Sequence, residues 1–577
     1  MEIMISKIAQ AKIIIWDLEA AKLHCDSGKV MIGSLCAIHD LRQHLTKVQD
    51  VAFSTNGDFL CSAGGQDDNA IVIWDVASGE ALCGAPAASD SVLCCVWLNG
   101  RNDRIVTAGF YHVRVWQIDF RLPKLHPMDA KFANVRRVFL SVAISSDDHV
   151  AYCGTATGDV FKLKIDRNEI GSYNDPDTVV PVMLGCSKER FSKGVQSIAC
   201  IEDRVLVGAG DGTLTYLTSQ LKTSGGPRTV LMGGITSITL HPLGLSFMAG
   251  TDQCNRYEVT ADLSRAEMKM SCHYGSINDV TFPDNCPDLI VTCSSGDMRV
   301  WNARLSQELL RIQVPNLDCH TAIVSPTGTA LLSGWSDGKI RAFYPESGKM
   351  KFVIPDAHSE HVLALAAIDN DNASPWRIVS GGSDGRVRIW KIASSHQALV
   401  TSLKEHRGPV NAIRVSSDRS QCISASSDGC CIIWDLVRYV RINALFESNV
   451  FRSVQIHPDE SQILTCGTNH KITYWDSADC QAIRVIDGGE GSMTSLEIEN
   501  TGEFFVSGSA DKMVKVWHYD DGIAIAFGSG HSGQINAIKI SPDQKTIVSV
   551  GSTGEIIFWE MPSAPSLRAK LAEIMDS

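Results

Sequence analysis

The feature that most constrains the fold of this chain is a short apolar run, closed by tryptophan, that recurs along the sequence. The run reads CIIW at Trp434 and VKVW at Trp517, and between Trp301 and Trp559 its positions recur about every 43 residues. Nine such tryptophans are Trp16, Trp74, Trp116, Trp301, Trp390, Trp434, Trp475, Trp517 and Trp559. Four weaker copies end at Leu163, Leu217, Val259 and Phe343. A fixed period of this size indicates a repeat architecture, in which each unit buries its apolar face against its neighbours.

Each regular unit contains more than the tryptophan run. In the unit that ends at Trp434, residues 410–416 alternate apolar and polar side chains, and residues 421–426 form a second strand-like run. Ser427, Asp428 and Gly429 then predict a tight hairpin, because such turns need the positive φ that glycine adopts easily. This order of strands and turns resembles the WD40 repeat, which forms one four-stranded blade. The sequence therefore predicts an all-β protein of two tandem WD40 β-propellers of the seven-bladed type.

The repeat positions divide the chain into two propellers. Seven positions from 301 to 559 supply one complete ring, which we predict at residues 269–561. The six earlier positions fall short of a ring, so residues 1–268 are predicted to form a first propeller that lacks about one and a half blades at its N-terminus. Only fifteen residues precede Trp16, too few for a whole blade. We therefore expect an N-terminally shortened version of a longer protein.

Two segments fall outside the repeat pattern. Residues 166–192 are longer than a blade loop requires, and form either a contact loop or a disordered surface loop. Residues 562–577 form a C-terminal tail, in which Ser566 can cap a short helix with Leu567 and Leu571 on one face. That tail is either a frayed terminus or a helix that docks on a partner or on the propeller.

Polar residues recur at fixed places in the units and form the candidate site. A histidine precedes five units, at His44, His273, His358, His406 and His531. In one unit, His406, Ser424, Asp428 and Trp434 can form a buried hydrogen-bonded chain, which is stable only when every member has a partner. We therefore predict that these residues staple the blades and have no catalytic role. The predicted staples are Trp74, Trp116, Trp301, Trp390, Trp434, Trp475, Trp517, Trp559, His406, Ser424, Asp428, Asp384 and Asp511.

Charge and composition exclude several kinds of partner. Lys and Arg number 52 against 65 Asp and Glu, and the net charge of −13 disfavours nucleic acid and anionic membrane surfaces, both of which need a basic face. The N-terminus lacks a signal-peptide pattern, and no run of 18 apolar residues predicts a membrane-spanning helix. The 19 cysteines are scattered without a C-x-x-C pair, as is typical of a reduced cytosolic protein.

No motif in the sequence indicates a catalytic site. Gly381-x-Ser383-x-Gly385 matches a nucleophile elbow, but a strand follows where that motif requires a helix. Neither the phosphate-binding GxxxxGK[ST] motif nor the zinc-binding HExxH motif occurs. We therefore expect no enzymatic activity, no cofactor, no metal and no small-molecule substrate.

Several stretches outside the generic repeat pattern are similar to one family of WD-repeat proteins, the cilia- and flagella-associated protein 52 family. They are GGITSITL (233–240), ELLRIQVPNLDCH (308–320), SDGKIRAFYPESGKM (336–350), LKEHRGPVNAIRV (403–415), SSDGCCIIWDLVR (426–438), KITYWD (471–476) and GHSGQINAIKISPDQKTIVSVGSTGEI (530–556). The resemblance covers about residues 11–560. It implies two tandem propellers without enzymatic activity, and a structural role in motile cilia and flagella.

The resemblance also implies a place in the axoneme. A protein of this family is expected to be a microtubule inner protein that binds tubulin and other inner proteins inside the B-tubule of the doublet, near the inner junction. No short tubulin-binding motif accompanies the resemblance, so the sequence predicts no tubulin-contact residues. The alternative is a cytosolic WD-repeat scaffold or adaptor, such as a ubiquitin-ligase substrate receptor. Such receptors often carry W-D-x-R, which the WDLE, WDVA, WDLV and WDSA segments of this chain lack.

Overall fold

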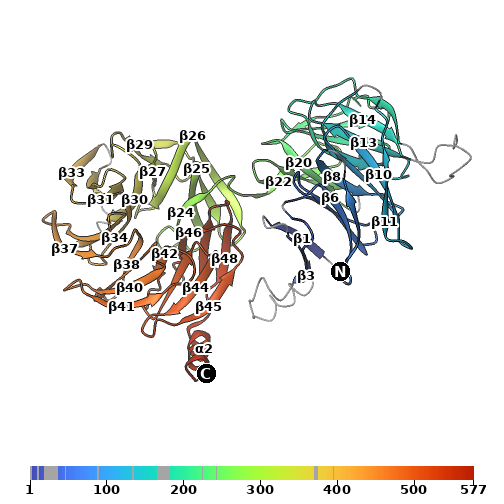
Figure 1. Ribbon diagram of the computed structural model, residues 1–577. Coiled ribbons are helices and arrows are strands. Elements are labelled where there is room, and N and C mark those ends of the chain that lie inside the picture. Colours follow the sequence, from blue (N-terminus) through green and yellow to red (C-terminus); the bar gives the residue numbers. More distant parts are fainter. Residues whose placement is uncertain are drawn as a thin grey trace, which may run out of the picture. The chain divides into compact units, whose positions relative to one another are not determined.

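The protein consists almost entirely of antiparallel β-sheets that are arranged in two compact units, Met1–Ser271 and Cys272–Ser577 (Figure 1). The computed structural model describes residues 3–8, 12–17, 37–45, 47–87, 90–132, 135–165, 181–223, 225–241, 244–368, 375–393 and 396–576. Residues 166–180 of the predicted insertion lie outside these ranges. The sequence predicts the boundary between residues 268 and 269, whereas strand β23 (Ala266–Ser271) belongs to the first unit, which ends at Ser271.

The described part of the first unit forms one three-stranded sheet followed by five four-stranded sheets. Sheet by sheet, its strands are β1 (Ile3–Ile8), β2 (Lys12–Asp17) and β3 (Ala37–Leu41); β4 (Val48–Phe53), β5 (Phe59–Gly64), β6 (Ala70–Asp75) and β7 (Ala81–Pro86); β8 (Val92–Trp97), β9 (Arg104–Gly109), β10 (Val113–Asp119) and β11 (Lys124–Asp129); β12 (Phe139–Ile144), β13 (Val150–Thr155), β14 (Val160–Lys164) and β15 (Val182–Cys186); β16 (Val195–Ile201), β17 (Arg204–Ala209), β18 (Thr213–Thr218) and β19 (Thr229–Val230); β20 (Ile235–Leu240), β21 (Ser246–Thr251), β22 (Asn255–Thr260) and β23 (Ala266–Ser271).

The second unit begins with a six-stranded sheet, continues with four four-stranded sheets and ends with a three-stranded one. Its strands are β24 (Ile277–Thr281), β25 (Leu289–Asn302), β26 (Gln307–Val324), β27 (Leu331–Trp335), β28 (Ile340–Phe343) and β29 (Met350–Ile354); β30 (Val362–Ile368), β31 (Trp376–Gly382), β32 (Val387–Ile392) and β33 (Gln397–Leu403); β34 (Val410–Val415), β35 (Gln421–Ser426), β36 (Cys430–Asp435) and β37 (Val440–Phe446); β38 (Phe451–Ile456), β39 (Gln462–Gly467), β40 (Lys471–Asp476) and β41 (Ala482–Asp487); β42 (Met493–Ile498), β43 (Phe504–Ser509), β44 (Met513–His518) and β45 (Ala524–Ser529); β46 (Ile535–Ile540), β47 (Thr546–Gly551) and β48 (Ile556–Glu560).

The six-stranded sheet is two blades joined by one long strand. The first part of β26 pairs with β25 up to Asp318, and its last part, from Cys319, pairs with β27. Strand β25 also serves twice, because it turns at Gly296, whose φ of 87° suits glycine. The sheets of the second unit therefore correspond to the seven repeat positions between Trp301 and Trp559.

The blade built from β34 to β37 shows why the repeat folds in this way. Its strands pair in chain order and antiparallel, and the β35–β36 turn places Gly429 at a φ of 81°. Strand β36 is buried from Cys430 to Trp434, because it lies between two neighbouring strands and between two neighbouring blades. An inner strand that is apolar on both faces can be buried only by stacking blades face to face.

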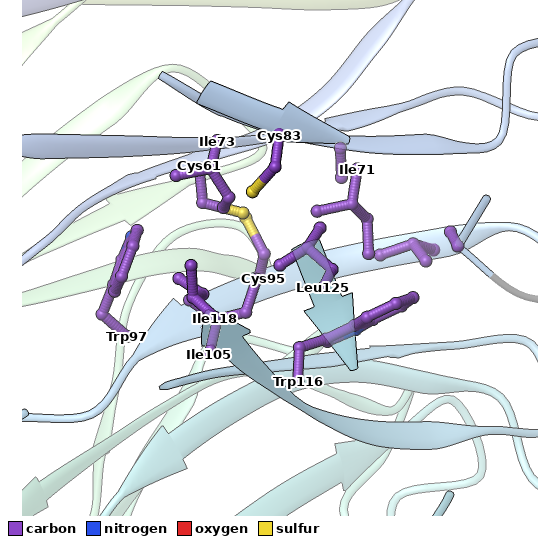
Figure 2. Packing of buried hydrophobic residues seen from close by; sticks show 13 residues of the cluster. Cys61, Ile71, Ile73, Cys83, Cys95, Trp97, Ile105, Trp116, Ile118 and Leu125 are labelled. Carbon is purple, nitrogen blue, oxygen red and sulfur yellow. The ribbon is translucent and has the colours of Figure 1, made fainter. Parts of the chain in front are cut away.

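Apolar side chains fill the space between consecutive blades. Figure 2 shows one such layer, in which Cys61, Ile73 and Cys83 of one blade meet Cys95 and residues of the next. Among these side chains Cys61, Ile73 and Ile105 are completely buried. The cysteines of this layer are free thiols that act as small apolar side chains.

The second unit closes into a ring through contacts between its first and last blades. Ile277 and Val280 of β24 pack with Val548 and Val550 of β47 in one buried cluster. Asn536 at the start of β46 donates to the Ser276 hydroxyl at 2.8 Å and to the Ile277 carbonyl at 2.7 Å. Side chains therefore join segments about 260 residues apart in the sequence.

The C-terminal tail forms helix α2 (Ala564–Asp576), which docks on the second propeller (Figure 1). Leu567 and Leu571 are buried in the same apolar cluster as Phe504 and Val514. Arg568 makes an ion pair with Glu503 at 2.5 Å. Of the two predicted states of the tail, the structure shows the docked helix, and the surface that receives it belongs to this chain.

Candidate functional site

The clearest polar arrangement of the second unit is the staple of the β34–β37 blade. Trp434 Nε1 donates to Ser424 Oγ at 2.8 Å, and Ser424 Oγ lies 2.7 Å from His406 Nε2. His406 Nδ1 lies 3.2 Å from Asp428 Oδ2. Because a carboxylate only accepts, Nδ1 carries the proton and Ser424 donates to Nε2. These four side chains lie within hydrogen-bonding distance of one another in turn, and they link the turn before β34 to β35 and β36.

Four other blades contain the same arrangement. The histidine Nε2 lies 2.6–2.8 Å from the hydroxyl of the equivalent Ser or Thr, and Nδ1 faces an acidic side chain. These sets are His44, Ser62 and Asp68; His273, Thr292 and Asp297; His358, Ser380 and Asp384; and His531, Ser549 and Glu555. The recurrence along the chain shows that the arrangement belongs to the repeat and not to one specialised site.

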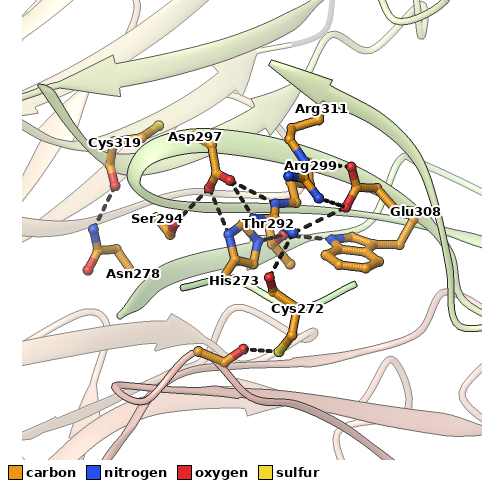
Figure 3. Close-up of polar contacts among 12 residues, drawn as sticks. Cys272, His273, Asn278, Thr292, Ser294, Asp297, Arg299, Glu308, Arg311 and Cys319 are labelled. Atoms are coloured by element: carbon orange, nitrogen blue, oxygen red, sulfur yellow. Dashed lines mark hydrogen bonds and ion pairs between the residues drawn. The ribbon is translucent and has the colours of Figure 1, made fainter. Parts of the chain in front are cut away.

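Figure 3 shows the set of His273, in which the tryptophan is Trp301. Asp297 here also binds Arg299, whose side chain is almost wholly buried. Arg299 donates in addition to the Cys272 carbonyl at 2.9 Å and to Glu308 at 3.1 Å. A buried guanidinium is tolerated because carboxylates and a carbonyl accept its N–H groups. This network ties the first residues of the second unit to its first blade.

All eight predicted tryptophans donate their indole N–H to a Ser or Thr on the neighbouring strand, at 2.7–3.0 Å. Asp511, another predicted staple, differs from the rest. It accepts from the Met513 backbone at 2.9 Å and binds Lys515 at 3.3 Å, and no described histidine bonds to it. Lys515 corresponds to Arg299 of the first blade, since its amino group likewise donates to a backbone carbonyl, that of Gly488, at 2.6 Å.

The protonation states of the staples are those of a structural network. Burial lowers the pKa of His273, His358 and His406, although the acidic neighbour of each raises it. Burial opposes ionisation of Asp297 and Asp384, yet hydrogen bonds and charge from their histidines hold the pKa of both carboxyls below the usual range. The folded state therefore favours neutral histidine beside carboxylate at neutral pH.

A second set of polar contacts joins several neighbouring blades around the central channel of the second unit. Asn278 donates to the Cys319 carbonyl at 2.7 Å, and Asn411 to that of Phe451 at 2.6 Å. Thr494 donates to the Ile535 carbonyl at 2.6 Å. Each of these residues is second in the innermost strand of its blade. Sequence reasoning missed them, although the shared position after a buried first residue was a visible signal.

The channel of the second unit is a polar cavity of about 190 Å³. Lys539 binds Glu497 at 2.7 Å, and Gln455 bridges Glu497 and Arg414 through bonds of 2.6 and 3.0 Å. Burial lowers the pKa of Lys539 and raises that of Asp279, which accepts from Thr321 at 2.9 Å. Cations and carboxylates neutralise one another along this wall, so the channel has the properties of a satisfied polar core.

The outer strands of the second unit expose apolar side chains to the surroundings. Those at least 39% exposed are Leu309 on β26, Met350 on β29, Leu399 and Val400 on β33, Val440, Ile442 and Phe446 on β37, Ile483 and Val485 on β41, and Phe527 on β45. They lie on the outer strands of several blades, where they are available for contact with other proteins. Among the described residues, no helix is long and apolar enough to cross a membrane.

A family model of the WD domain, G-beta repeat, matches six segments of the chain. They are residues 35–75, 265–302, 349–391, 397–435, 480–518 and 524–560. With the four-stranded blades and the repeated staple, this match defines a WD40-repeat β-propeller protein and confirms the predicted fold class.

Comparison with curated proteins shows the family. The chain is 42% identical to cilia- and flagella-associated protein 52 of Chlamydomonas reinhardtii, over 95% of its own length and 85% of the relative. The proteins of the same name from Bos taurus and Homo sapiens are 38% and 37% identical, over 96% of this chain and 85% of each relative. The chain belongs to the cilia- and flagella-associated protein 52 family.

Proposed function

We propose that this protein is a structural component of the axoneme in cilia and flagella, where it binds the lumenal wall of doublet microtubules and stabilises them for motility. The observation that carries the proposal is the similarity to cilia- and flagella-associated protein 52 over 95% of the chain. The partners of this role are tubulin and other inner proteins of the B-tubule, near the inner junction. The role requires no enzymatic activity and no cofactor.

The architecture of the second unit supports a load-bearing role. Apolar clusters and hydrogen bonds join consecutive blades, and the last blade packs directly on the first. A closed ring of this kind resists bending, because opening any joint exposes apolar surface on two blades. Its outer strands present apolar side chains on several blades, which gives different proteins separate places to bind.

The net charge of the chain favours binding to tubulin through shape-matched local contacts. The net charge of −13 gives no long-range attraction to an acidic tubulin surface. Apolar side chains such as Val440 and Phe446 instead offer contacts that ionic strength does not weaken. A protein held mainly by such contacts should resist extraction by salt.

The test is to express the tagged full chain in ciliated cells and to extract isolated axonemes with detergent and then with high salt. We expect the protein to stay with the doublet microtubules through both steps, and its density to lie inside the B-tubule in electron microscopy of the doublets. A protein that is diffuse in the cytoplasm and absent from washed axonemes would contradict the proposal. Copurification with a ubiquitin ligase in that case would favour the adaptor function.

A further inference from the structure

The staple of the β34–β37 blade contains an additional side chain that can bind metal. A ring nitrogen of His406, a carboxylate oxygen of Asp428 and the thiol of Cys430 all lie within 4.8 Å of one another, and His406 Nδ1 is the nitrogen that faces Asp428. They form the only such group of three histidine, cysteine or acidic side chains in the part of the chain that the structure describes. Their spacing in the sequence is no ligand motif, which explains why sequence reasoning predicted no metal here.

The same place in other blades is occupied by a cation. Arg388 lies 3.0 Å from Asp384 in the β30–β33 blade, and its Nη1 also lies 2.9 Å from His358 Nδ1. Cations bind the equivalent acid in three further blades, in the pairs Arg299–Asp297, Arg341–Asp337 and Lys515–Asp511. These positive charges offset the acidic charge of their staples.

The β34–β37 blade lacks this cation. The positions that hold Arg386 and Arg388 in the preceding blade, two and four residues after the acid, are here Cys430 and Ile432. No Lys or Arg makes an ion pair with Asp428 among the described residues. The His406 Nδ1 to Asp428 Oδ2 distance of 3.2 Å is also longer than the 2.8 Å between His358 and Asp384. A carboxylate without a cation partner therefore lies beside a free thiol and an imidazole nitrogen.

We propose that His406, Asp428 and Cys430 form a binding site for a thiophilic divalent transition-metal ion, with Zn²⁺ as its natural occupant. Thiolate, imidazole and carboxylate together suit zinc, whereas Ca²⁺ and Mg²⁺ prefer oxygen ligands alone. The fourth position of a tetrahedral site is open to water. It is also open to the carboxylate of Glu405, the residue before His406, which now pairs with Arg441 at 2.9 Å.

The surrounding bonds let the ligands change protonation while His406 keeps Ser424 as its partner, and the ion replaces the hydrogen bond between His406 and Asp428. With metal on Nδ1, the imidazole carries its proton on Nε2 and donates to Ser424, which in turn faces the Ile432 carbonyl. The net change is the release of the Cys430 thiol proton to solvent. Without metal that thiol stays protonated, because burial and the nearby Asp428 charge raise the pKa of Cys430 to about 12. Asp428 is held in place by the backbone N–H groups of Arg407 and Cys430.

A bound ion would join the segment before β34 to the β35–β36 hairpin of the same blade. That link reinforces a place that Arg or Lys strengthens in four other blades, and it couples the stability of the second unit to zinc by mass action. The proposed role of the ion is structural, because the His406 and Cys430 ligands are buried and the ion would hold two segments of one blade together.

The test uses the reduced full chain and Co²⁺ as a spectroscopic probe, followed by competition with Zn²⁺. We expect one equivalent of Co²⁺ to produce a thiolate-to-cobalt charge-transfer band that Zn²⁺ abolishes. Cys430→Ser should remove the band and weaken Zn²⁺ binding by more than about tenfold. The matched control Cys254→Ser changes an exposed cysteine outside the cluster and should leave both unchanged.

Two results would overturn the proposal. One is the absence of stoichiometric binding by the unmodified chain, and the other is a band of equal strength in Cys430→Ser. Cys430→Ala serves as a second variant, because its small apolar side chain suits a buried strand position if the serine variant unfolds. Neither result bears on the axonemal function, which the extraction experiment tests separately.

Discussion

Replacing Ser424 with alanine is the sharpest test of the blade staple, because it removes a single oxygen. That oxygen accepts the Trp434 indole N–H at 2.8 Å and donates to His406 Nε2 at 2.7 Å. Ser424 and Trp434 are completely buried, so water cannot replace the lost bonds. Leaving one buried donor and one buried acceptor without partners costs about 1–3 kcal/mol each. Ser424→Ala should therefore lower the unfolding free energy of the second unit by about 2–6 kcal/mol.

The matched control is Ser402→Ala in the neighbouring blade. The Ser402 hydroxyl is buried and has no hydrogen-bond partner, so losing it should be neutral or stabilising. Equilibrium unfolding in urea, followed by tryptophan fluorescence, measures both variants. Thermal scans give a second reading, in which 2 kcal/mol corresponds to a melting temperature lower by roughly 4–8 °C. Equal stability of the two variants would refute the assigned role of Ser424, because burial alone would then explain its place.

Three further predictions concern the second unit. Leu567→Ala should undock α2 and cost about 2–5 kcal/mol in urea unfolding, whereas the exposed Lys570→Ala should change the stability by less than about 0.5 kcal/mol. The melting temperature should fall as the pH is lowered from about 7.5 to about 5.5. Burial lowers the pKa of the staple histidines in the folded state, so the unfolded chain takes up protons near pH 6.5 that the folded chain does not bind. A constant melting temperature would contradict this. Asn536→Ala and Asn411→Ala should each lower the unfolding free energy by about 1–3 kcal/mol, because each asparagine donates to one serine hydroxyl and one backbone carbonyl. Unequal losses in urea unfolding would show that the joint between the first and last blades differs from the others.

Much of the fold could be predicted from sequence, because each repeat carries its own local signals. The tryptophan run predicts the buried third strand, and Asp-Gly predicts the hairpin before it, as Gly429 shows. The staple around His406 was equally accessible, since its histidine, serine, aspartate and tryptophan recur in order within one unit. Nearest-neighbour packing makes such local signals sufficient for the architecture of a repeat protein.

Contacts between one blade and another part of the chain could not be predicted from the local signals of a repeat. The asparagine bonds around the channel depend on which carbonyl the next blade presents, and that is a matter of three-dimensional register. Docking of α2 depends on an apolar surface around Phe504, some 60 residues earlier in the chain. Cys430 joins His406 and Asp428 only because the hairpin folds back on the preceding turn. Each of these features needs coordinates, since the residue types alone are common.

The closing joint of the second unit shows how the ring depends on side chains. In the described structure, the last sheet contains β46, β47 and β48, so no fourth strand from another part of the chain locks the ring. Closure depends instead on the buried contact of β24 with β47, on Asn536, and on the Cys272 thiol, which donates to the Gly554 carbonyl at 2.8 Å. These contacts join segments more than 250 residues apart, and their loop-closure entropy is the largest in the unit. The apolar cluster at this joint, which includes the completely buried Ile277, Val280 and Ile290, helps to offset that entropy loss by removing apolar surface from water.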